Sequence, residues 1–181
     1  MTNERMPAHH CPSGGDKMKP ALLVIDIQNK WLDTDPGLKE CLEKRVGTIN
    51  EAISFFRENL MPVIKIYHVD KDEGPMPGTP EFDFPSSIAI KANDIMVIKN
   101  YPDSFNKTGL MQVLRENGID TVVLAGLSAT CCVMATYVGA ENNDLCPYLL
   151  MGGVAAGSED KIKFAEEIMK TIRLNEIEGN P

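Results

Sequence analysis

The chain has 181 residues, 43% of them hydrophobic, which suits one folded domain with a single core. Its formal net charge of -8, with 18 Lys and Arg residues dispersed among 26 acidic ones, argues against binding to nucleic acid or anionic membranes. No apolar run reaches the roughly 18 residues of a spanning helix, and no apolar signal core begins the chain, so we expect a cytoplasmic protein that acts on small molecules.

The first part of the chain has no hydrophobic periodicity. We expect residues 1–19 to form a flexible tail, followed by one domain over residues 20–181. His9, His10 and Cys11 in the tail are too few ligands to predict a metal site. The five cysteines follow no framework spacing and are odd in number, so we predict free thiols and no structural disulfides.

Apolar runs alternate with helical patterns through the rest of the chain. The runs predict strands at residues 21–26, 62–69, 95–98, 121–125 and 147–151. Apolar residues at spacings of three and four predict helices at 38–56, near 110–117, from about 130 and from about 158. This alternation predicts a three-layer α/β/α domain with a parallel, Rossmann-like sheet. The Pro-rich and Gly-rich residues 70–93 have the length of a lid or specificity loop.

Three reactive residues each follow a predicted strand, namely Asp26, Lys99 and Cys132. Ligands of open α/β sheets bind outside the carboxyl ends of the strands, so these residues can converge on one pocket. Cys132 lies in the first turn of a predicted helix, where the helix dipole and a nearby Lys99 would favour the thiolate. We therefore expect a lowered thiol pKa and preferential alkylation of Cys132. Asp26 is the candidate base and acid for acyl transfer.

Each of these residues also has a structural interpretation. An Asp after a strand often caps a loop, a single Lys is usually solvated, and a helical Cys is usually a small buried hydrophobe. Their complementary roles at the same rim favour catalysis over three unrelated structural roles.

Three ordered motifs carry a family resemblance. They are Leu-Leu-Val-Ile-Asp26-Ile-Gln28-Asn29 with Trp31, Val-Ile-Lys99 followed by Ser104-Phe105, and Gly126-Leu-Ser128 leading to Cys132-Val133. The sequence resembles the isochorismatase-like cysteine hydrolases, which include N-carbamoylsarcosine amidohydrolase, nicotinamidase and isochorismatase. The resemblance covers about residues 20–175.

The resemblance implies the isochorismatase-like hydrolase fold, with five or six parallel strands. It implies strand order 3-2-1-4-5, with a possible sixth strand near residues 174–177, whereas the sequence alone leaves order 2-1-3-4-5 open. It also implies an Asp26, Lys99, Cys132 triad and an oxyanion hole formed by the N–H groups of Ser128 and Cys132. A cis peptide bond between Leu127 and Ser128 is implied as well.

The resemblance also assigns the nucleophile and the pocket. The family's cysteine lies six residues after the glycine and just before a valine, which selects Cys132 over Cys131. Gln28, Trp31, Phe105 and Cys131 are candidate substrate-binding residues.

Some positions depart from the family's pattern. Ala129 stands where many relatives have Thr, and Gly152-Gly153-Val-Ala replaces a common Asp-Ala pair. The Asp-x-His motif of metal-containing nicotinamidases is absent, so we predict no metal and no cofactor. His68 is interpreted as a packing residue at a strand end.

We therefore predict a cysteine hydrolase that cleaves a C–N bond of a small amide, ureide or carbamoyl compound through a thioester. We expect it to be a homo-oligomer. Two alternatives remain open: vinyl ether hydrolysis with Asp26 as the proton donor, and a non-catalytic small-molecule binding module.

Overall fold

The structure is a computed structural model that describes residue 11, residues 17–70, residue 72 and residues 74–177. Most of the tail predicted over residues 1–19, including His9 and His10, lies outside the described residues. Within the described ranges, no helix combines the length and the apolar character needed to span a bilayer.

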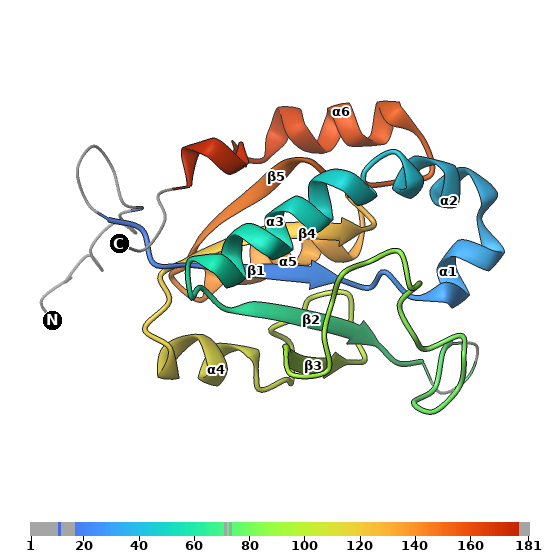
Figure 1. The fold of residues 1–181 in the computed structure, drawn as a ribbon, viewed down its shortest axis with the longest axis horizontal. Coiled ribbons are helices and arrows are strands. Elements are labelled where there is room, and N and C mark those ends of the chain that lie inside the picture. The colour runs from blue at the N-terminus through green and yellow to red at the C-terminus, as the bar shows by residue number, and fades with distance from the viewer. Residues whose placement is uncertain (1–10, 12–16, 71, 73, 178–181) are drawn as a thin grey trace, which may run out of the picture.

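Six strands form one sheet in which all neighbouring strands are parallel (Figure 1). The strands are β1 (Pro20–Ile25), β2 (Val63–His68), β3 (Ile95–Lys99), β4 (Thr121–Leu127), β5 (Cys146–Ala155) and β6 (Thr171–Ile172). Their order is β3-β2-β1-β4-β5-β6, which confirms the predicted order 3-2-1-4-5. The predicted sixth strand is misplaced by a few residues. Thr171 and Ile172 already pair with β5, and Leu174–Glu176 form a short 3-10 helix.

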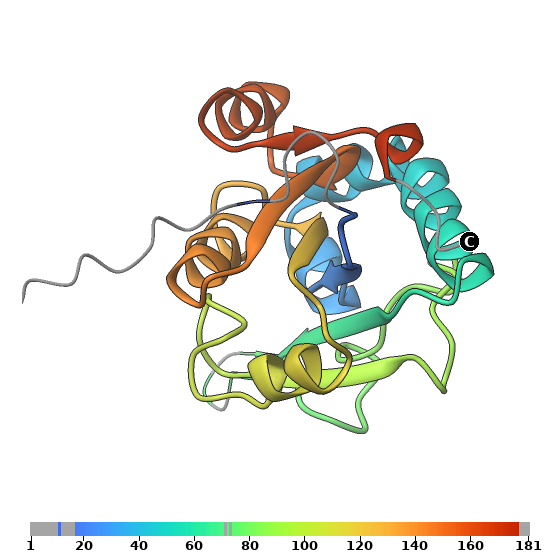
Figure 2. The same cartoon turned by 90° about the vertical axis from the view of Figure 1, so that its left-hand side faces the viewer.

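Helices cover the two faces of the sheet. They are α1 (Asn29–Thr34), α2 (Pro36–Glu43), α3 (Val46–Glu58), α4 (Leu110–Glu116), α5 (Cys132–Asn142) and α6 (Glu159–Ile168). Figure 2 shows α3 on one side of the sheet and α5 on the other. The predicted α/β class, with a parallel sheet between helical layers, is confirmed.

The apolar stripe over residues 38–56 forms two helices rather than one. α2 begins after Asp35, whose side chain accepts a hydrogen bond from the Leu38 N–H at 3.0 Å. After the end of α2, the Arg45 guanidinium donates to the Cys41 carbonyl at 2.9 Å. A side chain thus satisfies a carbonyl that a continuing helix would have bonded, and the chain turns before α3 begins.

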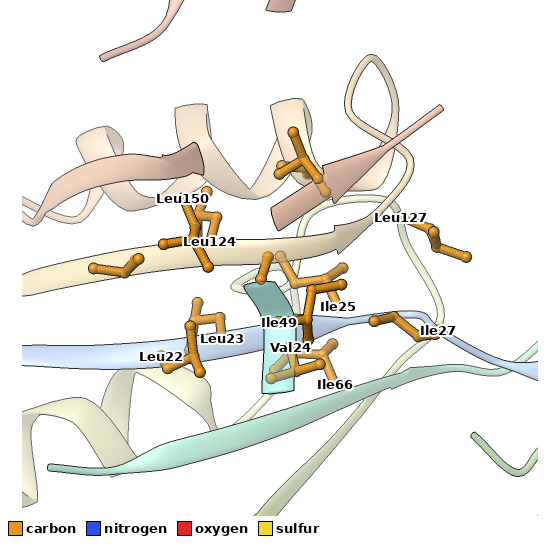
Figure 3. Close-up of a cluster of buried hydrophobic side chains, with 14 of the residues drawn as sticks. Leu22, Leu23, Val24, Ile25, Ile27, Ile49, Ile66, Leu124, Leu127 and Leu150 are labelled. Atoms are coloured by element: carbon orange, nitrogen blue, oxygen red, sulfur yellow. The ribbon is translucent and has the colours of Figure 1, made fainter. Parts of the chain in front are cut away.

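The core is centred on β1, every residue of which is buried. Figure 3 shows Leu22 and Ile25 of this strand among Ile49 of α3, Ile66 of β2 and Leu124 of β4. A parallel strand covered on both faces needs apolar side chains in an unbroken run, which explains the sequence of β1. The central strands are therefore fixed, and they hold their carboxyl ends in a constant arrangement.

Two cysteines form a disulfide that the sequence does not predict. Cys11 is bonded to Cys146, the first residue of β5, with the two Cα atoms 5.4 Å apart. All strands are parallel, so the chain entering β1 lies at the same end of the sheet as the start of β5. The prediction of no disulfide is therefore wrong, because this proximity arises only from the fold. Cys41, Cys131 and Cys132 are free.

Candidate active site

Polar side chains gather at the carboxyl edge of the sheet. Asp26 follows β1, His68 ends β2, Lys99 ends β3, Ser128 follows β4, and Cys132 is the first residue of α5. The parallel register places all five at one rim, on both sides of the central strand. The strand ends that the sequence singles out therefore do converge in space.

Lys99 lies at the buried bottom of this site. Its side chain is fully buried, and its Nζ lies 2.6 Å from Asp26 Oδ2, 3.1 Å from His68 Nδ1 and 3.2 Å from the Tyr101 carbonyl oxygen. An ammonium group has three N–H donors and no acceptor, so each donor has a partner here. Lys99 is therefore a fixed positive charge with no donor left for a ligand.

Asp26 is buried beside this charge and adopts a left-handed backbone conformation, with φ of 52°. Apart from Lys99 and the Cys132 thiol, its carboxylate oxygens have no hydrogen-bond partner among the described residues. Burial raises the pKa of the Asp26 carboxyl, while the charge of Lys99 lowers it. A buried carboxylate with a raised pKa and unused acceptor capacity is able to take up a proton.

Cys132 points its thiol toward Asp26, and one acceptor atom each from Asp26, His68 and Cys132 lie within 4.8 Å of one another. The hydrogen bond with Cys131, burial and the charge of Asp26 raise the pKa of the Cys132 thiol, against the opposing charge of Lys99. The expectation of a lowered pKa at Cys132 is therefore not met. In a partly buried site next to a carboxylate, the thiol rests in its protonated form.

Cys131 carries the more acidic thiol of the pair. It is exposed, and its hydrogen bond with Cys132 lowers the pKa of the Cys131 thiol to about 6. A thiolate at position 131 can be hydrated, whereas one at position 132 would face Asp26 in a less accessible position. The first proton lost by the two neighbouring thiols therefore comes from Cys131.

The turn between β4 and α5 supplies backbone N–H groups to the site. Ala129 N–H donates to the Ala155 carbonyl at 2.9 Å, which ties this turn to β5. In the described part of the chain, the N–H groups of Ser128 and Cys132 donate to no backbone carbonyl. The N–H of Cys132 contacts the Cys131 sulfur. The cis bond expected between Leu127 and Ser128 is absent, since every peptide bond among the described residues is trans, the form that non-proline residues strongly prefer.

A cavity of about 270 Å³ opens over these groups. It is lined by Asp26, Trp31, Leu38, His68, Pro102, Leu127, Ser128, Cys131 and Cys132. Its volume suits a small ligand. A cavity of about 280 Å³ at the opposite end of the strands, near Pro20 and Pro62, has no cysteine or histidine in its described lining.

The candidate substrate-binding residues divide into two groups. Trp31 and Cys131 line the cavity, whereas Gln28 and Phe105 do not. The Gln28 side chain is buried and bonds both the N–H and the carbonyl of His68, at 2.8 and 3.1 Å. Phe105 packs in the core.

Sequence reasoning missed the position of His68. Its ring lies between Lys99 and the cavity and meets the Trp31 ring edge to face, with centroids 5.8 Å apart. Burial and the charge of Lys99 lower the pKa of His68, which therefore stays neutral near pH 7. Its position at the end of a predicted strand could have identified it, because the same kind of position identified Lys99 at the end of β3.

Asp26, His68 and Cys132 are the residue types that bind transition metals. However, the Lys99 ammonium lies within 2.6 Å of Asp26 and 3.1 Å of His68. A metal cation bound by these two side chains would be repelled by the nearby Lys99 ammonium. The arrangement therefore fits proton transfer better than metal binding.

The fold and the site define a class: a parallel α/β protein with a partly buried thiol beside a carboxylate at the carboxyl edge of the sheet. Residues 20–175 match the family model of the isochorismatase domain, so the chain belongs to the isochorismatase family of hydrolases.

Three similar proteins place the chain within this family. The crystal structure of N-carbamoylsarcosine amidase from Thermoplasma acidophilum superposes with a TM-score of 0.76 at 30% identity, covering 90% of this chain and 100% of that one. A maleamate amidohydrolase of Pseudomonas putida is 38% identical over 142 residues, which are 67% of this chain and 65% of that protein. YddQ of Bacillus subtilis, an uncharacterized isochorismatase family protein, is 28% identical over 159 residues, covering 83% of this chain and 87% of that protein.

The two adjacent thiols make a specific prediction. Iodoacetamide should modify Cys131 before Cys132, with a pH midpoint near the pKa of about 6 at Cys131. In Cys132→Ala the hydrogen bond that lowers this pKa is lost, so the midpoint should move toward the ordinary value of about 8.5. The pH dependence of the labelling rate, followed by mass spectrometry, measures this shift. Cys41, which is buried, is the internal control. An unchanged midpoint in Cys132→Ala would contradict the coupling of the two thiols.

Proposed function

We propose that this chain is a cysteine-dependent amidohydrolase that cleaves a C–N bond of a small amide, ureide or carbamoyl compound through a thioester on Cys132. The observation that carries the proposal is the buried ion pair between Lys99 Nζ and Asp26 Oδ2, at 2.6 Å, directly beside the Cys132 thiol. The names of two similar proteins, N-carbamoylsarcosine amidase and maleamate amidohydrolase, support cleavage of this type of bond.

In the first half of the proposed reaction, Asp26 takes the proton of the Cys132 thiol as the sulfur attacks the carbonyl carbon of the substrate. The carbonyl oxygen becomes an oxyanion, which the N–H groups of Ser128 and Cys132 stabilise. Asp26 then returns the proton to the nitrogen, the C–N bond breaks, and ammonia or an amine leaves. The acyl group remains on Cys132 as a thioester.

In the second half, Asp26 takes a proton from a water molecule that attacks the thioester. The tetrahedral intermediate collapses, the C–S bond breaks, and the proton returns to the Cys132 sulfur. Lys99 keeps its charge throughout and balances the anion wherever it is located, on Asp26 or on the sulfur. The raised pKa of Asp26 suits this repeated exchange, because it makes the carboxylate a stronger base than an ordinary Asp side chain.

The test uses two neighbouring cysteines as variant and matched control. Ammonia release should be measured over a panel of small amides and ureides with the wild type, Cys132→Ala and Cys131→Ala. We expect Cys132→Ala to lose turnover entirely, because the Cys132 thiol faces Asp26. Cys131→Ala removes an exposed thiol of the cavity wall, so it should keep measurable turnover with a changed KM. Rapid acid quenching should trap an acyl adduct on Cys132 in the wild type. Retained turnover in Cys132→Ala would refute the thioester mechanism.

A second candidate is vinyl ether hydrolysis, for which Asp26 would act as the proton donor. The observation in its favour is the burial that raises the pKa of this carboxyl, since a protonated Asp is required. Asp26→Asn and Cys132→Ala discriminate the two reactions. The amidohydrolase needs both residues, whereas the ether hydrolase loses activity only in Asp26→Asn.

A further inference from the structure

The charge of the ligand is constrained by what lines the cavity. Among the described residues that line it, none is Lys or Arg, Asp26 is the carboxylic acid, and the Cys131 thiol, with its pKa of about 6, is a second acidic group. Lys99 lies behind Asp26, is fully buried, and has used its three donors on Asp26, His68 and Tyr101. The ion pair of Lys99 and Asp26 therefore offers no free cation to a second carboxylate.

A carboxylate on the ligand would consequently be desolvated without a counter-ion. The wall is formed by Trp31, Leu38, Pro102 and Leu127, which cannot replace the water lost from a charged group. The net charge of -8 on the chain adds a repulsive field for anions. The same wall is favourable for an apolar group, which gains by leaving water.

His68 supplies a directed polar contact. The Lys99 ammonium can only donate, so His68 Nδ1 must accept at 3.1 Å, and the ring of the neutral side chain then carries its proton on Nε2. Because His68 also lines the cavity, this Nε2–H is a donor available to a ligand. The main-chain bonds from Gln28 hold the residue in place, at 2.8 and 3.1 Å.

We propose that the site takes a small uncharged amide whose apolar body packs on Trp31 and Leu38 and whose second polar atom accepts a hydrogen bond from His68 Nε2–H. This rests on the proposed function and narrows it to one class of substrate. It separates this chain from enzymes for amides that bear a carboxylate, such as maleamate and N-carbamoylsarcosine.

Two matched pairs of amides test the charge. Butyramide differs from succinamate, and (Z)-but-2-enamide from maleamate, by a methyl group in place of a carboxylate. With the wild type, we expect kcat/KM to be at least about tenfold larger for the uncharged member of each pair. A carboxylate member that is hydrolysed as well or better, in a reaction that needs Cys132, would overturn this inference and leave the proposed function intact.

Binding can be measured without turnover. The chain has one tryptophan, and Trp31 lines the cavity, so its fluorescence reports occupancy directly. Titration of Cys132→Ala with each pair should give tighter binding of the uncharged member. Equal affinities, or no response to either member of both pairs, would overturn the inference even if no amide were hydrolysed.

Variants at position 68 test the donor, using N-(2-oxopropyl)butyramide as a ligand with an additional carbonyl and butyramide as the ligand without it. His68→Gln keeps one acceptor for Lys99 and one donor for the ligand, whereas His68→Leu keeps neither. We expect His68→Leu to raise KM for the ligand with the additional carbonyl more than for butyramide, and His68→Gln to restore the difference. If the variants changed KM equally for both ligands, His68 would have only a structural role, and its assignment as a donor would be overturned.

Discussion

Replacing Lys99 by Met is expected to abolish measurable turnover and to destabilise the protein. The variant leaves the buried Asp26 carboxylate without the cation that lies 2.6 Å away. Breaking a buried ion pair by removing one partner typically costs about 3–5 kcal/mol. Losing the fixed charge should also lower kcat/KM by about 10³-fold or more, because a negative charge on Asp26 or on the Cys132 sulfur would then have no counter-ion. Urea denaturation and the ammonia-release assay measure the two effects.

Two further variants identify the cause. In the double variant Asp26→Asn with Lys99→Met both charges are gone, so part of the stability should return while activity stays lost. Lys44→Met removes a lysine that is exposed and pairs with Glu40 on the surface of α2, and it should leave the midpoint of urea denaturation essentially unchanged. A Lys99→Met protein as stable as the wild type would contradict the buried ion pair.

Replacing Gly126 by Ala should prevent the protein from folding. Gly126 lies in β4 with φ of 115°, and a Cβ there would overlap the backbone oxygen and nitrogen of Ile25 in β1. A backbone atom of a central strand cannot move aside as the end of a side chain can. We expect a loss of about 4 kcal/mol or more, a large share of the stability of a domain, seen as insoluble or unfolded protein by circular dichroism.

Two other glycines separate overlap from backbone strain. Gly118 has φ of 65° but open space around it, so Gly118→Ala should cost only the strain of a left-handed residue, about 1–2 kcal/mol. Gly47, within α3, also has nothing within 4 Å, and Gly47→Ala should be neutral or stabilising by up to about 1 kcal/mol. A Gly126→Ala protein with the stability of Gly118→Ala would refute the close approach of β4 to β1.

Much of the fold could be predicted from local pattern. Buried parallel strands are apolar throughout, so β1 and β4 stand out, and helices alternate with them. The rule that parallel strands bind ligands at their carboxyl ends then places Asp26, Lys99 and the start of α5 at one rim. The strands, the helices and the position of the site could be predicted because they depend on short stretches of sequence and on a general property of α/β sheets.

The features that the sequence did not predict depend on contacts between segments that are far apart in the chain. The Cys11–Cys146 disulfide joins residues separated by 135 positions. The direction of the pKa shift at Cys132 depends on Cys131 and on burial as well as on Lys99, so a helix start near a lysine does not determine it. The position of the His68 ring depends on its contact with Lys99, which joins β2 to β3. Hydrophobic periodicity reports which face of an element is buried, and it carries no information on such pairs.

Gln28 ties the end of β2 to the chain that follows β1. Its side-chain amide accepts from the His68 N–H and donates to the His68 carbonyl, as a peptide group of a neighbouring strand would. The Asp26 N–H still donates to the Ile66 carbonyl of β2 at 3.0 Å, and the main chain turns away after it, so the Gln28 side chain continues the hydrogen-bonded ladder past the end of β1. One glutamine side chain therefore spans the gap between the chain after β1 and the end of β2. Asn would be one methylene too short to span it, and Glu, which has no N–H, would leave the His68 carbonyl without its donor.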